Sequence, residues 1–249
     1  SARHPGDLGR LHGRPRHRAG STAADRRRPR APGDPVPRPG AVEHAIETGA
    51  ACAVPASRPG LARDLPVPDP DKIICLGFNY SEHAAEVHLS VPPAPTFFAK
   101  FRNALCGPTS PIKLPRVSTQ IDYEGELTVI IGKRCREVTE GEALGCVAGY
   151  TIINDVSARD LQMQTSQWMA GKTLDTFAPM GPGIVPAWDI PDPQTLGITT
   201  KVNGVTLQKG NTSDMIFPVD RVIVFLSSLM TLEPGDIIAT GTPSGVGFK

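Results

Sequence analysis

The stretch DYEGELTVII at residues 122–131 decides how this chain folds. Its apolar half, residues 126–131, has the length and composition of a buried strand, and Gly132-Lys133 ends it. Glu124 and Glu126 lie two residues apart, so on a strand both carboxylates project from one face. Two like charges held so close need a cation or a shared proton. On spacing alone, however, such a pair is more often the solvated face of a sheet than a metal site.

Apolar runs of strand length recur on both sides of that stretch. They predict strands at residues 72–76, 95–100, 147–153, 198–202, 205–208 and 237–240, with Asn203-Gly204 as the turn of a hairpin. Helices are expected at residues 81–87, 140–144, 157–167 and 218–230, the second after the capping-box pattern that begins at Thr139. Many short strands and few helices indicate a β-rich α+β fold, a sandwich or roll, rather than a doubly wound sheet.

Residues 1–65 differ from the rest of the chain in composition. They contain 12 Arg, no Lys and 6 acidic residues, hence a charge of +6, whereas residues 66–249 carry −5. They also contain 9 Pro and 8 Gly but no aromatic residue, so they can neither cover a core nor form a continuous amphipathic helix before about residue 41. We expect a disordered head at 1–65 and a folded domain at 66–249. We favour neither a transit peptide nor a nucleic-acid arm.

The rest of the composition narrows the class of protein. At 249 residues the chain can bury a core, and its longest apolar stretch, near residues 222–226, is far below the roughly 20 residues of a membrane span. The five cysteines are widely spaced and form no C-x-x-C pair, which argues against a disulfide framework and a zinc site. We expect a cytoplasmic protein without a membrane segment.

A third carboxylate, Asp155, stands between the apolar run at 147–153 and the predicted helix at 157–167. Its side chain could cap that helix, or it could join Glu124 and Glu126 as a metal ligand. Ligands that are all hard oxygen atoms suit Mg²⁺, Mn²⁺ or Ca²⁺ rather than zinc or copper. Three carboxylates also leave coordination positions open for water and substrate.

Seven phrases follow one another between about residues 70 and 248: KIICLGFNYSEHAAE, FFAKFRNALCGP, DYEGELTVIIGK, AGYTIINDVSARDLQ, GKTLDTFAPMGP, VNGVTLQ and PGDIIATGTPSGVG. Together they resemble the fumarylacetoacetate hydrolase family. The resemblance implies a mixed β-sandwich roll with short helices, a homodimer, and Mg²⁺ or Mn²⁺ held by Glu124, Glu126 and Asp155. Family members continue beyond the GTPSGVGF phrase, so we expect this chain, which stops at Lys249, to lack the last strands of the roll.

His83 and Glu86, in the phrase SEHAAE, lie three residues apart, one above the other on a helical turn. A carboxylate at that place can orient the imidazole, although a lone His–Glu pair is usually a surface contact. The resemblance implies a lid helix on which His83 is the base that activates water and Glu86 is its partner.

The other candidate site residues come from the later phrases. Arg159 and Gln162 share a helical face and can reach toward Asp155, although solvent-exposed polar residues often show the same spacing. The resemblance implies that both contact substrate oxygens, that Lys172 neutralises enolate charge and that Thr242 binds a carboxylate. The glycine-rich run at residues 241–247 lacks the Gly-Lys-Ser/Thr of a phosphate loop, so no nucleotide site is expected.

These residues predict a metal-dependent hydrolase that cleaves a C–C bond in an acylpyruvate or other 1,3-diketo acid, through an enolate that the metal stabilises. Its partner is then a small 2-oxo or diketo acid. The same site could decarboxylate or isomerise an oxaloacetate-like or ring-cleavage 2-oxo acid. A truncated, inactive family member is a further alternative. A nucleic-acid binder that uses the arginine-rich head finds no support in residues 66–249.

Overall fold

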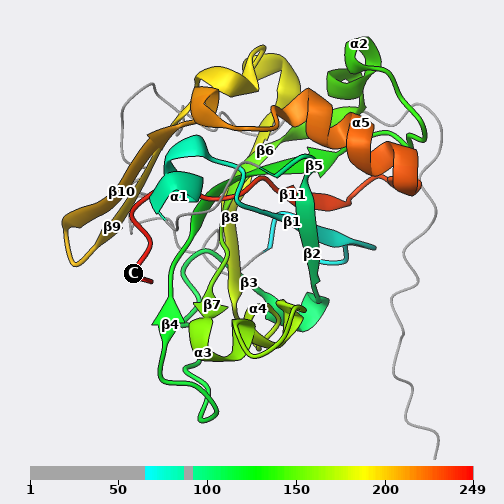
Figure 1. Ribbon diagram of the computed structural model, residues 1–249. Coiled ribbons are helices and arrows are strands. Elements are labelled where there is room, and N and C mark those ends of the chain that lie inside the picture. Colours follow the sequence, from blue (N-terminus) through cyan, green and yellow to red (C-terminus); the bar gives the residue numbers. More distant parts are fainter. Residues whose placement is uncertain (1–64, 87–91, 249) are drawn as a thin grey trace, which may run out of the picture. The chain divides into compact units, whose positions relative to one another are not determined.

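The computed structural model of the protein describes residues 65–86 and 92–248, so the head predicted at residues 1–65 lies outside it, apart from Leu65. Within this part of the chain a curled seven-stranded sheet has the order β2-β1-β11-β5-β6-β8-β3 (Figure 1). Its strands are β1 (Ile73–Gly77), β2 (Thr96–Lys100), β3 (Leu105–Cys106), β5 (Gly125–Ile131), β6 (Val147–Asn154), β8 (Ala178–Pro186) and β11 (Ile237–Ala239). The pairs β1–β11 and β3–β8 are parallel and the others antiparallel. This mixed sheet confirms the β-rich prediction over a doubly wound one.

Two small strand pairs and several short helices complete the described elements. The pairs join β4 (Ile121–Asp122) to β7 (Ser157–Ala158), and β9 (Gly197–Val202) to β10 (Val205–Asn211). The α-helices are α1 (Ser81–Glu86), α2 (Glu140–Ala143), α3 (Arg159–Gln162), α4 (Met169–Lys172) and α5 (Val219–Leu229). Turns of 3₁₀ helix occupy Arg102–Ala104, Leu144–Cys146, Ala187–Asp189, Pro193–Thr195 and Thr212–Asp214. Among the described helices none is long and apolar enough to cross a membrane.

Two local signals in the sequence are confirmed. Asn203 and Gly204 both have positive φ, 51° and 81°, as the tight turn between β9 and β10 requires. The capping box before α2 is also present, because Thr139 and Glu142 bond reciprocally through side chain and backbone.

The helix predicted at residues 157–167 is wrong in its first turn and its length. Ser157 and Ala158 are extended, because they pair with Asp122 and Ile121 in the antiparallel β4–β7 ladder. The helix begins only at Arg159 and ends at Gln162. Asp155 therefore does not cap this helix, because the residue at the N-cap is Ala158.

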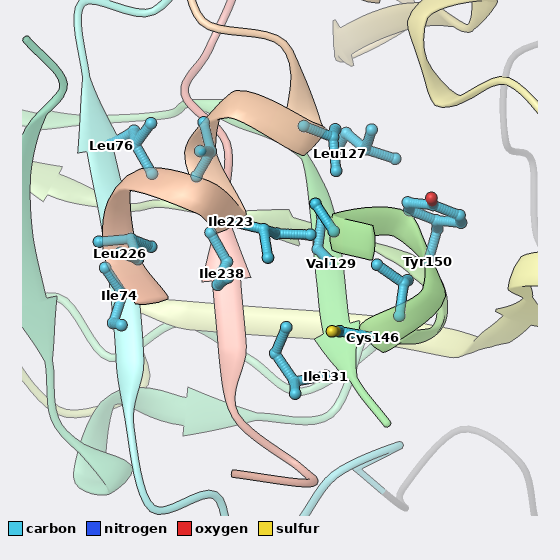
Figure 2. Close-up of a cluster of buried hydrophobic side chains, with 14 of the residues drawn as sticks. Ile74, Leu76, Leu127, Val129, Ile131, Cys146, Tyr150, Ile223, Leu226 and Ile238 are labelled. Carbon is cyan, nitrogen blue, oxygen red and sulfur yellow. The ribbon is translucent and has the colours of Figure 1, made fainter. Parts of the chain in front are cut away.

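The two faces of the central sheet bury different side chains because successive residues of a strand point to opposite sides. One face packs against α5, which lies across the sheet in Figure 1 and contributes Ile223 and Leu226 to a large apolar cluster (Figure 2). Strand β5 adds Leu127, Val129 and Ile131 to that cluster. The residues of β5 that alternate with these three, Glu126 among them, therefore point to the other face of the sheet, away from α5.

Candidate active site

The three predicted metal carboxylates meet at one end of the β5–β6 ladder. The strands are antiparallel and pair Glu126 with Ile153, so the beginning of β5 lies beside the end of β6. A backbone hydrogen bond from Asp155 N to Glu124 O, 2.8 Å long, closes the ladder there. One carboxylate oxygen from each of Glu124, Glu126 and Asp155 lies within 4.8 Å of the others, and all three residues are buried. Strand alternation and register thus assemble the triad that the sequence predicted.

Two basic side chains pair with this triad. Lys172, at the end of α4, places Nζ 2.5 Å from Oε2 of Glu124 and 2.9 Å from Oδ2 of Asp155. Arg159, at the start of α3, places Nη1 2.7 Å from Oε1 of Glu124 and 3.0 Å from Oε1 of Gln162. The structure therefore brings the predicted substrate-binding pair and the predicted enolate-neutralising lysine to the carboxylates.

Lys100 is a third cation at the site, and it was not among the residues predicted from the sequence. Its Nζ lies 2.7 Å from Oδ1 of Asp155 and donates to the backbone oxygens of Val156, Phe177 and Lys172, the first two at 3.0 and 2.9 Å. The side chain is fully buried at the end of β2. A signal was available, because a lysine inside the apolar run FFAKF is unusual unless it is paired.

Burial and neighbouring charges shift the pKa values of these groups, in the same sense for Glu126 and in opposite senses for Asp155 and Lys172. Burial, then the neighbouring Asp155 and Glu124, raise the pKa of Glu126 well above its usual value. Burial also opposes ionisation of Asp155, but Lys100 and Lys172 outweigh it and hold the pKa of that carboxyl below its usual value. Burial works against the charged form of Lys172 as well, yet Asp155 and Glu124 raise its pKa. Asp155 and Lys172 are therefore ionised at neutral pH, whereas no described residue forms an ion pair with Glu126.

The residues present fit a hard divalent cation. Oε2 of Glu126 accepts a hydrogen bond from Gly241 N at 2.8 Å, but Oε1 is buried and has no hydrogen-bond partner among the described residues. An unpartnered buried carboxylate oxygen is costly, and a cation would satisfy it. Since the donors are carboxylate oxygens without His or Cys, the set suits Mg²⁺ or Mn²⁺.

The predicted base lies on α1, which a buried asparagine holds against the sheet. Asn79 donates to the backbone oxygens of Thr240 and Phe217 at 2.8 and 3.1 Å and accepts from Phe217 N at 2.8 Å. His83 is buried on this helix and its ring stacks on that of Phe78. Nδ1 of His83 lies 3.4 Å from Oε2 of Glu86, so the predicted dyad is brought together.

One pocket joins the base to the carboxylates. Its polar lining comes from His83, Glu124, Glu126, Arg159, Gln162, Lys172 and Thr242, all of them predicted site residues. Glu86 and Asp155 do not line the pocket but touch residues that do. The apolar side consists of Leu76, Gly77, Phe78, Phe98 and Trp168, and a Cβ on Gly77 would lie 2.3 Å from the Trp168 ring. The hydroxyl of Thr242 donates to Gly125 O at 3.0 Å and accepts from Gln208 Nε2 at 2.7 Å.

Comparison with known proteins agrees with this arrangement. Residues 72–249 match the family described as fumarylacetoacetate (FAA) hydrolase, C-terminal. This chain belongs to the fumarylacetoacetate hydrolase family. The fumarylacetoacetate hydrolase family is an enzyme family, and the fold described above, a mixed sheet with short helices, is that of its solved members.

Relatives within the fumarylacetoacetate hydrolase family carry different names. The chain is 50% identical over 190 residues to a fumarylacetoacetate hydrolase domain-containing protein 2 homolog of Dictyostelium discoideum, covering 72% of this chain and 62% of that protein. It is 45% identical over 193 residues to a mitochondrial oxaloacetate tautomerase of Xenopus laevis, covering 77% of this chain and 60% of that protein. A crystal structure of 5-carboxymethyl-2-hydroxymuconate delta-isomerase from Mycobacterium smegmatis has a TM-score of 0.66 and 44% identity, covering 72% and 70% of the two chains. The chain thus spans about three fifths of the length of the first two proteins.

Proposed function

We propose that this chain is a divalent-metal-dependent enzyme that acts on a 2-oxo or 1,3-diketo acid through its enolate. The observation that carries the proposal is one pocket lined by His83, Lys172 and two carboxylates of a buried triad whose third member, Asp155, lies directly behind it. Mg²⁺ or Mn²⁺, held by Glu124, Glu126 and Asp155, would supply a Lewis acid beside the substrate's oxygen atoms.

The charges around the pocket support an anionic substrate. The groups around it include the buried carboxylates of Asp122, Glu124, Glu126 and Asp155 and the buried cations of Lys100, Arg159 and Lys172. These four carboxylates outnumber the three cations by one, so a divalent ion leaves this buried set with one positive charge. Such a site favours the carboxylate of a 2-oxo acid and the negative charge that develops on its enolate oxygen.

Hydrolysis of an acylpyruvate-type substrate is the first candidate reaction. With Glu86 beside Nδ1, the other ring nitrogen of His83 can take a proton from water. The hydroxide adds to the distal carbonyl and the C–C bond breaks, so that the acyl half leaves as a carboxylic acid and the electron pair of the broken bond forms the pyruvate enolate. Lys172 lies at the carboxylates and supplies positive charge to the enolate, which a proton then converts to pyruvate.

Tautomerisation of an oxaloacetate-like acid is the second candidate, because the Xenopus relative is named an oxaloacetate tautomerase. In that reaction His83 removes a proton from the carbon beside the ketone, the resulting enolate takes up a proton on its oxygen to give the enol, and no C–C bond breaks. Decarboxylation passes through the same enolate. A location in the cytoplasm, a homodimer and an inactive state remain predictions from the sequence.

A substrate panel tests the proposal. The purified chain would be assayed with Mn²⁺ and with chelator on acylpyruvates, by pyruvate release, and on oxaloacetate, by enol absorbance and by CO₂ release. We expect turnover of at least one substrate that stops with chelator. Turnover that is indifferent to chelator, or no turnover of any of them with Mn²⁺, would refute the proposal.

A further inference from the structure

The buried carboxylate of Asp122 has no part in the reaction proposed above, yet it accepts an unusual number of hydrogen bonds. Oδ1 accepts from the backbone N–H groups of Tyr123 and Gly247, each at 2.8 Å. Oδ2 accepts from Nε and Nη2 of Arg159 at 2.8 and 2.6 Å and from Phe248 N at 3.1 Å. These donors come from three segments that are far apart in the sequence, so Asp122 holds those segments together.

On one side Asp122 fixes the direction of Arg159. Because Nε and Nη2 both face the same carboxylate, the guanidinium plane is set and Nη1 points to Glu124 Oε1 at 2.7 Å. The ring of Phe248 lies under the guanidinium, 5.6 Å from Cζ, and adds a cation–π contact. Asp122 thereby reaches one of the metal carboxylates through a single intervening side chain.

On the other side Asp122 holds the loop of residues 244–248, which in turn holds α1. Two contacts join this loop to the helix: Ser244 Oγ donates to Glu82 Oε2, and Gly245 N donates to Glu86 Oε2, both at 3.1 Å. Oε2 of Glu86 is the same atom that faces Nδ1 of His83. The loop therefore determines where the partner of the base points.

We propose that Asp122 is a positioning residue that couples the base on α1 to the metal carboxylates. The path runs from His83 through Glu86, Gly245 and the loop to Asp122, and from there through Arg159 to Glu124. Each link is a hydrogen bond or an ion pair, except that the covalent backbone connects Gly245 to Gly247. Only the kinetic measurements that test this inference rest on the proposed function.

The first test is hydrogen–deuterium exchange of the α1 amides in Asp122→Asn. An asparagine keeps the size of the side chain but is uncharged and has only one acceptor oxygen, so its NH₂ group must face the donors of either Oδ1 or Oδ2. We expect the peptide that contains residues 81–86 to exchange about tenfold faster, because the lost hydrogen bonds favour local opening. Asp160→Asn is the matched control, because Asp160 is next to Arg159 but bonds to Ser118 and Leu161 instead of the loop.

A second variant separates the two sides of Asp122 and serves if Asp122→Asn does not fold. A Cβ on Gly247 would lie 2.7 Å from Oδ1 of Asp122, so Gly247→Ala should push the loop off the carboxylate and spare the two hydrogen bonds from Arg159 to Asp122. We expect it to speed exchange in α1 and to lower kcat about tenfold, with KM and Mn²⁺ affinity within about twofold of wild type. Asp122→Asn should lower kcat and Mn²⁺ affinity together.

The exchange and kinetic results answer different questions. Exchange in α1 that stays at the wild-type rate in both variants, or that rises equally in Asp160→Asn, would overturn the coupling. If the wild-type chain turns over no substrate, the proposed function fails, and the exchange measurement still decides whether Asp122 holds α1. Faster exchange without any change in kcat of an active enzyme would show a structural contact only and would also refute the positioning role.

Discussion

The carboxylate side of the pocket and the base side are held in place by different means. Glu126 lies within β5, a central strand of the sheet, and Asp155, directly after β6, pairs with two buried lysines. His83, in contrast, is on a helix of six residues, where its one polar contact within residues 65–86 and 92–248 is with Glu86 at 3.4 Å. The fold therefore depends on the carboxylate side, whereas the base depends on a few contacts of one helix. Changes on the two sides should affect stability, metal binding and turnover in different proportions.

The largest effect on the reaction is expected from Glu126→Gln. The substitution removes one of the proposed metal ligands without breaking an ion pair. We expect kcat/KM to fall at least a thousandfold because the metal is lost, which corresponds to roughly 4 kcal/mol of activation free energy. Because burial raises the pKa of Glu126, the metal-free variant should melt above the metal-free wild type. Melting curves with and without Mn²⁺ measure both effects.

The matched control for that variant is Glu140→Gln, since Glu140 is an exposed glutamate paired with Arg221. It should keep activity and the melting shift that Mn²⁺ causes. A Glu126→Gln protein that still gains stability from Mn²⁺ would show that the three carboxylates are not the metal site.

Lys100→Met tests how strongly the fold depends on the carboxylate side. Methionine fills a similar volume but leaves Asp155 with one lysine and three backbone carbonyls without their donor. Breaking a buried pair in this way should cost about 3 kcal/mol of unfolding free energy, measured by urea titration. Lys113→Met, at an exposed lysine, should stay within about 0.5 kcal/mol of wild type. Equal stability of the two variants would contradict the role given to Lys100.

His83→Ala tests the base side. We expect kcat to fall about a hundredfold, the lower end of what general acid–base catalysis contributes. Mn²⁺ affinity should stay within about twofold of wild type, because in the described part of the chain no hydrogen bond or ion pair joins His83 to the three carboxylates. Isothermal titration and steady-state kinetics on the same preparation give both numbers. Loss of Mn²⁺ binding in this variant would reverse the division between the two sides.

Strand alternation is local, so the sequence placed Glu124 and Glu126 on one face of a strand and Asp155 at the end of another. That spacing alone favoured a solvated sheet surface over a metal site. The seven ordered phrases assigned the metal role to the three carboxylates and added the roles of His83 and Lys172. The strands that carry the site were predicted because their apolar residues are consecutive.

What the sequence analysis missed depends on contacts between distant segments. Lys100 is held by residues 55 to 77 positions further along the chain, and Asp122 by Gly247 and Phe248, 125 and 126 positions away. The strand pair at Ser157–Ala158 replaced a predicted helical turn because residues 121–122 offered a partner. No local propensity encodes such pairings, so they appear only when the fold is known.

The smallest expected effect is a pH dependence of the Mn²⁺ affinity, and it also distinguishes the carboxylate side from the base side. Burial and then Asp155 and Glu124 raise the pKa of Glu126, so its proton competes with the metal at a higher pH than for an ordinary glutamate. Mn²⁺ affinity should therefore fall as pH falls, by about tenfold per pH unit below that pKa, and recover as pH rises. His83→Ala should show the same dependence, because the titrating group lies on the carboxylate side. An affinity that stays constant from pH 8 to about pH 5 would mean that Glu126 is already ionised without the metal.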